Sequence, residues 1–145
     1  MHLNDAFARH SGYDITFCHH EQACAMAADA YFRISGRPAI VQVTTGPGAI
    51  NAMNGVFGAF VDSVPMIIIS GQVRTDTIAQ NVVPGLRQMG DQEAPVVEMA
   101  RPITKMSHLL RSRDELASVV VQAWIMATTG RPGPVWIDVP IDIQG

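Results

Sequence analysis

Two histidines and a glutamate stand side by side at His19, His20 and Glu21, and they are the first residues of the chain that could do chemistry. A metal site needs ligands that converge on one ion. Three consecutive side chains alternate faces in a strand and fan about 100° apart on a helix, so these three do not converge. Cys18 and Cys24 also lack the number and spacing of zinc ligands. We therefore expect no metal site within this sequence.

Glu21 opens an alanine-rich stretch, residues 21–35, that predicts a helix stopped by Gly36. A carboxylate in the first turn of a helix favours the helix dipole by roughly 0.3–1 kcal/mol, which would be a purely structural role. Because the helix is apolar on every side, its first turn is also expected to be buried, and burial raises the pKa of a carboxyl. A protonated carboxyl in a cleft can donate a hydrogen bond to a ligand nitrogen. Residue chemistry leaves the structural and the functional role of Glu21 equally open.

A second candidate is the turn TTGPGAIN, residues 44–51, between a β-type run and a helical run. Its two glycines allow a tight turn and close approach of a ligand to the start of a helix. The dinucleotide fingerprint requires glycine where Asn51 stands, and an acid after the next strand, where this chain has Ser70, Gly71 and Gln72. Both requirements fail, which weighs against a nucleotide-binding domain. A plain strand-to-helix turn remains the structural alternative.

The elements that would position these residues alternate between β-type and helical segments. The pattern predicts strands at residues 13–19, 39–44, 65–70, 103–110 and 135–140, and helices at residues 21–35, 49–62, 92–99 and 113–128. The run PMIIIS (65–70) is apolar without alternation, which is typical of a parallel strand covered on both faces. Residues 71–91 predict a long functional loop, and Ser112 is the expected cap of the last helix. The order of elements indicates an α/β fold with a mostly parallel central sheet.

Composition limits the classes of protein to which the chain can belong. It has 145 residues, of which 48% are hydrophobic and 16% charged, and a net charge of −3. These values predict a single packed domain over residues 1–145, with no basic surface for nucleic acid and no membrane segment. Two cysteines form no disulfide framework, so a cytoplasmic location is expected.

A series of segments carries a more specific signal because of its order along the chain. The stretch from HHEQACAMAADAYF to PMIIISGQV, and then QMGDQE, RPITK and TGRPGPVWIDVPIDIQ, resemble the pyrimidine-binding domain of thiamine-diphosphate-dependent enzymes of the acetolactate synthase group. The resemblance runs from about Asp14 to Gln144. It implies the three-layer fold of that domain without the family's first strand, as part of a longer multi-domain enzyme.

The resemblance also implies roles for individual residues. Glu21 would activate the aminopyrimidine ring of thiamine diphosphate through a hydrogen bond to N1′, in a reaction that decarboxylates a 2-oxo acid such as pyruvate and joins the product to a second carbonyl compound. The residues expected against the ring are Thr45, Gly46, Pro47 and Asn51. Gln92 and Lys105 would lie on the substrate side. Asp91 stands where acetolactate synthases commonly carry phenylalanine, so the identity of the substrate stays open.

The resemblance also implies that part of the cofactor site lies outside these residues. The family holds the diphosphate and Mg²⁺ in another domain, and the cofactor lies between two subunits. The resemblance therefore implies a half-site that needs a diphosphate-binding domain or subunit, together with self-association. The alternative is a non-catalytic remnant that folds and self-associates without binding the cofactor tightly.

Overall fold

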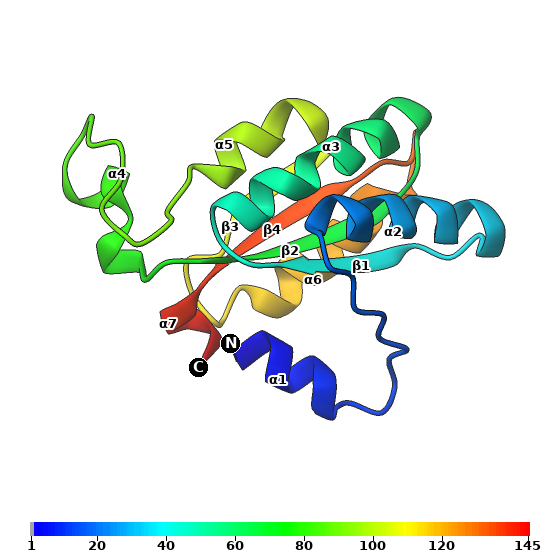
Figure 1. Ribbon diagram of the computed structural model, residues 1–145, viewed down its shortest axis with the longest axis horizontal. Coiled ribbons are helices and arrows are strands. Elements are labelled where there is room, and N and C mark those ends of the chain that lie inside the picture. The colour runs from blue at the N-terminus through cyan, green and yellow to red at the C-terminus, as the bar shows by residue number, and fades with distance from the viewer. Residues whose placement is uncertain (1) are drawn as a thin grey trace.

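Four parallel strands form the centre of the structure, a computed structural model that describes residues 2–145 (Figure 1). The strands are β1 (Ala39–Val43), β2 (Met66–Gln72), β3 (Met106–Leu109) and β4 (Val135–Pro140). Their order across the sheet is β1-β2-β4-β3. In this register Ser70 of β2 lies beside Asp138 of β4. The two inner strands, β2 and β4, are thus the ones that carry buried polar residues.

Helices cover both faces of the sheet, which gives the three layers expected from the sequence (Figure 1). One face carries α2 (Glu21–Ser35), α3 (Pro47–Asp62) and α5 (Val96–Ala100). The other face carries α6 (Leu116–Thr128), with α1 (His2–Arg9) and α7 (Ile141–Gln144) beside it. Single turns of helix occur at Thr75–Thr77, α4 (Ala79–Val82) and Arg101–Ile103. The α/β fold with a parallel central sheet is confirmed.

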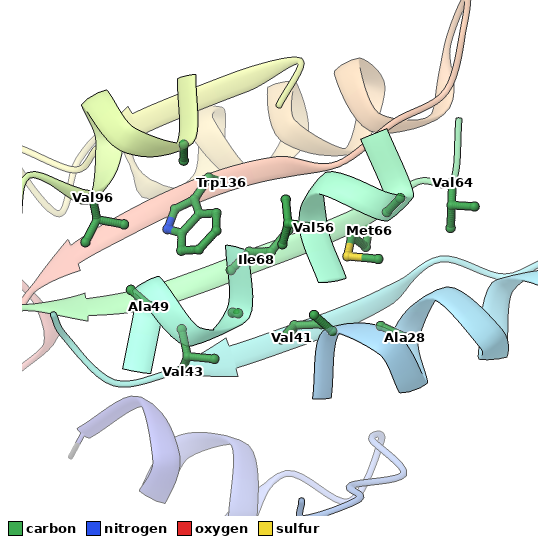
Figure 2. Packing of buried hydrophobic residues seen from close by; sticks show 14 of the residues in the cluster. Ala28, Val41, Val43, Ala49, Val56, Val64, Met66, Ile68, Val96 and Trp136 are labelled. Carbon is green, nitrogen blue, oxygen red and sulfur yellow. The ribbon is translucent and has the colours of Figure 1, made fainter. Parts of the chain in front are cut away.

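The apolar run of β2 serves two separate cores. Met66 and Ile68 point into the cluster under α2 and α3, where Trp136 and Val56 also pack (Figure 2). Ile67, between them, points to the opposite cluster under α6. Alternate residues of the strand are therefore buried on opposite faces, and this explains why the run shows no polar alternation.

The expected strand at residues 13–19 is wrong. Residues 13–18 have no regular structure, and Phe17 is 87% exposed. The segment pairs with no strand of the sheet, whose edge on this side is β1. β-type residues form a strand only where a neighbouring strand supplies hydrogen bonds and packing, so their propensity alone was not sufficient.

The other expected strands and helices are confirmed with shifted ends. The helix expected at residues 92–99 begins only at Val96, and the helix expected at 113–128 begins at Leu116. Ser112 does not cap this helix. Instead the Glu115 carboxylate accepts hydrogen bonds from the backbone N–H groups of Arg111 and Ser112, which holds the chain in a bend before α6. None of the helices within residues 2–145 combines the length and the apolarity needed to cross a membrane.

The α2 helix is covered on one side only, which corrects the expectation that it is buried all round. Ala25 and Ala28 are buried against α3 and the sheet. Met26, Tyr31 and Ile34 lie on the outer side and are exposed. The helix is apolar on both sides, but it stands at the edge of its layer and has a neighbour on only one of them (Figure 1). Its first turn, which carries Glu21, is therefore less buried than the sequence predicted.

The contact between α2 and α3 depends on a glycine. A Cβ atom at Gly55 of α3 would stand 2.6 Å from the Cβ of Ala25 and 3.1 Å from the backbone nitrogen of Met26. The first distance is shorter than real Cβ contacts allow, and the second is tighter than most of them and involves backbone, which moves less readily than a side chain. Gly58, one turn further along the same helix, has nothing within 4 Å of the corresponding position. Gly55 and Gly58 are therefore a crowded and an open position of the same helix, and can be compared by the same substitution.

We expect Gly55→Ala to lower the free energy of unfolding by roughly 1–3 kcal/mol, because the added methyl group would force α2 and α3 apart. Gly58→Ala should instead raise it by about 0.5–1 kcal/mol, because alanine loses less backbone entropy in a helix. Chemical denaturation of both variants measures the two values. Equal effects of the two substitutions would contradict this account of the packing.

Candidate functional site

The candidate site lies at the carboxyl ends of β1 and β2. Thr44 and Thr45 follow the last residue of β1, Gln72 ends β2, and Glu21 begins α2 close to the start of α3. Ligands of open parallel α/β sheets bind at this edge, beyond the carboxyl ends of the strands. The structure therefore brings Glu21 together with the glycine turn.

His20, and not Glu21, caps α2. The His20 Nδ1 atom accepts a hydrogen bond of 3.1 Å from the Gln22 backbone N–H. The Glu21 carboxylate is consequently free of the capping role and bonds elsewhere. Asn51, in the first turns of α3, donates from Nδ2 to Glu21 Oε2 at 3.1 Å.

The charge state of Glu21 also differs from the expectation. The Asn51 hydrogen bond above all, and then the backbone N–H of Glu21 itself, hold the pKa of this carboxyl below its usual value, against a smaller opposing effect of burial. The positive ends of α2 and α3 also favour a negative charge here. The predicted raised pKa is thus wrong, because the first turn of α2 is only half-buried. Glu21 is a carboxylate that accepts hydrogen bonds.

Both glycines of the turn make room for close approach. A Cβ at Gly48 would stand 3.1 Å from Glu21 Oε1 and 2.6 Å from the Thr44 methyl group, so any side chain there would cover the carboxylate. Gly46 has a φ of 52°, and a Cβ at this position would stand 1.7 Å from the carbonyl oxygen of Gln92. Only glycine fits that position. Pro47 then begins α3, where its missing N–H costs nothing.

A cavity of about 300 Å³ opens beside the Glu21 carboxylate. This volume is at the lower end of the range for small-molecule sites, roughly 300–1,000 Å³. Glu21, Thr45 and Gln72 lie in its wall, whereas Gly46, Pro47 and Asn51 do not. Its other lining residues include Cys18, Cys24, Gln42 and Gln144. The cavity is therefore large enough for one flat ring beside Glu21.

A buried polar cluster below this cavity was missed by the sequence analysis. Asp138 is 1% exposed and has no cationic partner among residues 2–145. Its Oδ1 accepts from the Ser70 hydroxyl and its Oδ2 from Gln72 Nε2 at 2.8 Å. The indole N–H of Trp136 donates to the same Ser70 oxygen at 2.8 Å. Burial raises the pKa of Asp138 to about 7, against the two hydrogen bonds, which lower it. An aspartate inside the otherwise apolar strand VWIDVP was the signal that could have revealed the cluster.

The two residues expected on the substrate side lie in different places. Gln92 adopts a φ of 57°, uncommon for a residue with a side chain, and its carbonyl group lies against Gly46. Its segment is held by Glu93, whose carboxylate accepts from the backbone N–H groups of Ala79, Met89 and Gly90. The structure thus brings Gln92 to the glycine turn.

Lys105 lies at the opposite edge of the sheet, just before β3 begins. Its ammonium group donates to the carbonyl oxygen of Thr129 at the end of α6 at 2.7 Å. The structure therefore does not bring Lys105 together with Glu21. Across residues 2–145, no group of three His, Cys, Asp or Glu side chains is placed to hold a metal ion.

Comparisons with known proteins place the chain in a family. Residues 1–94 match the family described as thiamine pyrophosphate enzyme, N-terminal TPP binding domain. Acetolactate synthase 3, chloroplastic, of Brassica napus is 41% identical over 144 residues, which are 99% of this chain and 21% of that protein. The acetolactate synthase large subunit of Haemophilus influenzae is 38% identical over 142 residues, 98% of this chain and 23% of that protein. The chain therefore spans between a fifth and a quarter of the length of these relatives.

The hydrogen bond from Asn51 generates a first prediction for this site. We expect Asn51→Ala to raise the pKa of Glu21 towards its ordinary value, because the largest contribution to the lowered pKa is lost. Carbon-detected NMR titration of the Glu21 carboxyl measures this pKa. Asn54→Ala is the control, because Asn54 lies one turn along α3 and accepts from Gln22 rather than bonding Glu21. An unchanged Glu21 pKa in Asn51→Ala would show that Asn51 does not set the charge state.

The buried Asp138 predicts how stability depends on pH. In the unfolded chain this aspartate ionises near pH 4, whereas in the folded chain it keeps its proton up to about pH 7. The folded state therefore binds more protons between these values, and its stability should fall as pH rises from about 4 to about 7, in total by about 4 kcal/mol. Above that range Asp138 contributes no further slope. Chemical denaturation at a series of pH values should show that Asp138→Asn lacks this component while Asp142→Asn, at an exposed position, retains it. Identical pH profiles for wild type and Asp138→Asn would refute the assignment.

Proposed function

The chain belongs to the thiamine pyrophosphate enzymes through its N-terminal TPP-binding domain, and we propose that it forms the half of the cofactor site that holds the aminopyrimidine ring. The observation that carries the proposal is the Glu21 carboxylate. It stands where α2 and α3 begin, is oriented by Asn51, and lies in the wall of a cavity of about 300 Å³. The proposed enzyme is similar to acetolactate synthases: it decarboxylates a 2-oxo acid such as pyruvate and ligates the product to a second carbonyl compound.

The residues present suit a flat, nitrogen-containing ring. The absence of a side chain at Gly48 leaves Glu21 Oε1 uncovered, and a Cβ there would come within 3.1 Å of it. Gly46 lets the turn lie directly against the backbone of Gln92. A ring placed in the cavity beside Thr45 and Gln72 would meet the Glu21 carboxylate at one edge. Thiamine diphosphate supplies the nucleophilic carbon for such reactions, and the protein supplies binding, orientation and proton handling.

In this proposal Glu21 acts as a hydrogen-bond acceptor for a protonated N1′ of the ring. Its lowered pKa favours the charged carboxylate, so the role proposed for Glu21 is to accept a hydrogen bond from the ring nitrogen. A negative charge next to N1′ favours the protonated ring, and this is the form that Glu21 must stabilise. Asn51 orients the carboxylate through Oε2 and leaves Oε1 for the ligand. Thr45, Gly46 and Pro47 shape the turn against which the ring would lie.

The remaining parts of the activity are proposed to come from outside this domain. Binding of the diphosphate and of Mg²⁺ is assigned to another domain or subunit, in keeping with relatives that are four to five times as long as the matched region. Gln92, which touches the glycine turn, is placed on the substrate side. Lys105 lies at the far edge of the sheet, so a substrate role for it requires a site completed by a second copy of the chain. Self-association of the chain is part of the same proposal.

Titration of the 145-residue chain with thiamine diphosphate, followed by NMR, tests the proposal. We expect weak binding with amide shifts at Glu21, Thr45 and Gly48, because only one end of the cofactor would be held. Glu21→Gln should weaken binding by about tenfold or more, since a hydrogen bond to a charged group contributes roughly 1.5–3 kcal/mol.

Asp114→Asn, the corresponding carboxylate-to-amide substitution at an exposed position before α6, should leave the affinity unchanged. Binding that is insensitive to Glu21→Gln would remove Glu21 from the site. Absence of any binding at millimolar cofactor, with the chain folded, would favour the alternative of a non-catalytic domain.

A further inference from the structure

Gln72 connects three parts of the structure that the sequence analysis treated separately. Its Nε2 donates to Asp138 Oδ2 at 2.8 Å and to the carbonyl oxygen of Ala94 at 3.1 Å. Its Oε1 accepts from the Thr45 hydroxyl at 3.0 Å and from the backbone N–H of Val73 at 2.9 Å. One buried amide therefore joins the centre of the sheet to the glycine turn and to the segment that ends two residues after Gln92.

The orientation of this amide determines whether those contacts exist. With Nε2 towards Asp138, Gln72 offers an oxygen to Thr45 and Val73. If the amide were reversed, its NH₂ group would face the N–H of Val73, and the carbonyl oxygen of Ala94 would face another oxygen. Both of those pairings are repulsive, and each would leave a buried polar group without a partner. Thr45 and Ala94 thus depend on which way the Gln72 amide points.

Asp138 is the group that selects the orientation. Each of its two oxygens accepts one hydrogen bond, Oδ1 from Ser70 and Oδ2 from Gln72. Glu98 of α5, which is also acidic, acts on Asp138 through its charge and raises its pKa further. When Asp138 is ionised, above about pH 7, Oδ2 offers only an acceptor to Gln72, so it requires the NH₂ end of the amide.

We propose that Asp138 is a positioning residue, which through the Gln72 amide sets the places of the Thr45 hydroxyl and of the backbone segment that follows Gln92. Asp138 lies below the cavity, is 1% exposed, and reaches the turn only through Gln72. Its importance for ligand binding rests on the proposed function, whereas its control of Gln72 does not. Position 138 is then constrained by the geometry of the site as well as by the packing of the core.

Asp138→Asn tests this because it changes the hydrogen-bonding pattern with almost no change in shape. An asparagine NH₂ group directed at Gln72 forces the amide to reverse. An asparagine NH₂ group directed at Ser70 meets an oxygen that already accepts from Trp136, and it leaves the Ser70 hydroxyl hydrogen without its acceptor. Neither arrangement reproduces the wild-type network, so the Gln72 amide loses its single preferred orientation.

The experiment follows the Gln72 side-chain NH₂ resonances of the 145-residue chain by ¹⁵N NMR at a pH above 7, where Asp138 is ionised and differs from asparagine in its hydrogen-bonding pattern. In Asp138→Asn we expect the wild-type pair of signals to shift or split, with shifts at the Thr45 and Ala94 amides. Hydrogen exchange at the Val73 N–H should accelerate by about fivefold or more. Ser70→Ala is the matched control: it removes the bond to Oδ1 but leaves the bond to Oδ2. It should reduce stability while the Gln72, Thr45 and Ala94 signals stay in place.

Gln72→Met keeps the test decisive if Asp138→Asn does not fold. This variant retains the shape of the side chain, removes all four amide contacts, and should shift Thr45 and Ala94 in the same way. Adding Asp138→Asn to it should cause no further shift at either residue. Unmoved Gln72, Thr45 and Ala94 signals in folded Asp138→Asn, or unmoved Thr45 and Ala94 in Gln72→Met, would overturn the proposal.

Titration with thiamine diphosphate separates this proposal from the proposed function. If the Gln72 signals respond to Asp138→Asn but the cofactor does not bind the wild-type chain, the proposed function fails and the positioning role stands. If the cofactor binds the wild-type chain, Asp138→Asn should weaken its binding by about fivefold or more, with Ser70→Ala close to wild type. Equal loss of affinity in both variants would count against positioning and for general destabilisation.

Discussion

The site depends on one buried acid. The carboxyl group of Asp138 lies in the middle of a parallel sheet, and no cationic side chain among residues 2–145 pairs with it. Burying an acid of this kind is costly unless each of its oxygens is hydrogen-bonded. In this structure Ser70 and Gln72 supply those bonds to Asp138 from the neighbouring strand. Gln72 donates to Asp138 in the core and accepts from Thr45 at the glycine turn. The hydrogen bonding of the buried acid and the position of Thr45 are therefore coupled.

The same reasoning applies to the backbone around Glu21. Gly48 and Gly55 lie in one helix, α3, and both mark places where that helix touches the beginning of α2. Gly55 permits the helices to pack closely, and that packing brings Asn51 within hydrogen-bonding distance of Glu21. Gly48 then leaves the far side of the carboxylate uncovered. A helix contact that looks like ordinary packing is thus what sets the charge and the access of the candidate catalytic group.

Much of the fold could be predicted from the sequence, because β2 and β4 are apolar runs and α2, α3 and α6 are long helical stretches. Glu21, Thr45 and Gln92 were predicted as site residues from ordered segments that resemble a known family, and the structure places all three at the glycine turn or in the wall of the cavity beside it. What could not be predicted depended on neighbours in space. Residues 13–19 have strand-forming side chains but no strand beside them, and the first turn of α2, although apolar, is covered on one side only. Periodicity reports which faces are apolar, and it does not report whether something packs on them.

The pKa of Glu21 is low because the first turn of α2 is only half-buried, and this pKa decides whether the group is a charged acceptor. In the chain as described, the Asn51 hydrogen bond outweighs the small effect of burial, so the carboxylate is charged. A ring placed against Oε1 would displace water and act in the opposite direction, because desolvation disfavours the charged form. The hydrogen bond from the ligand would again favour the charge. The pKa of Glu21 is therefore subject to two opposing effects. Because the Asn51 hydrogen bond is already present without a ligand, the carboxylate is charged before a ring binds.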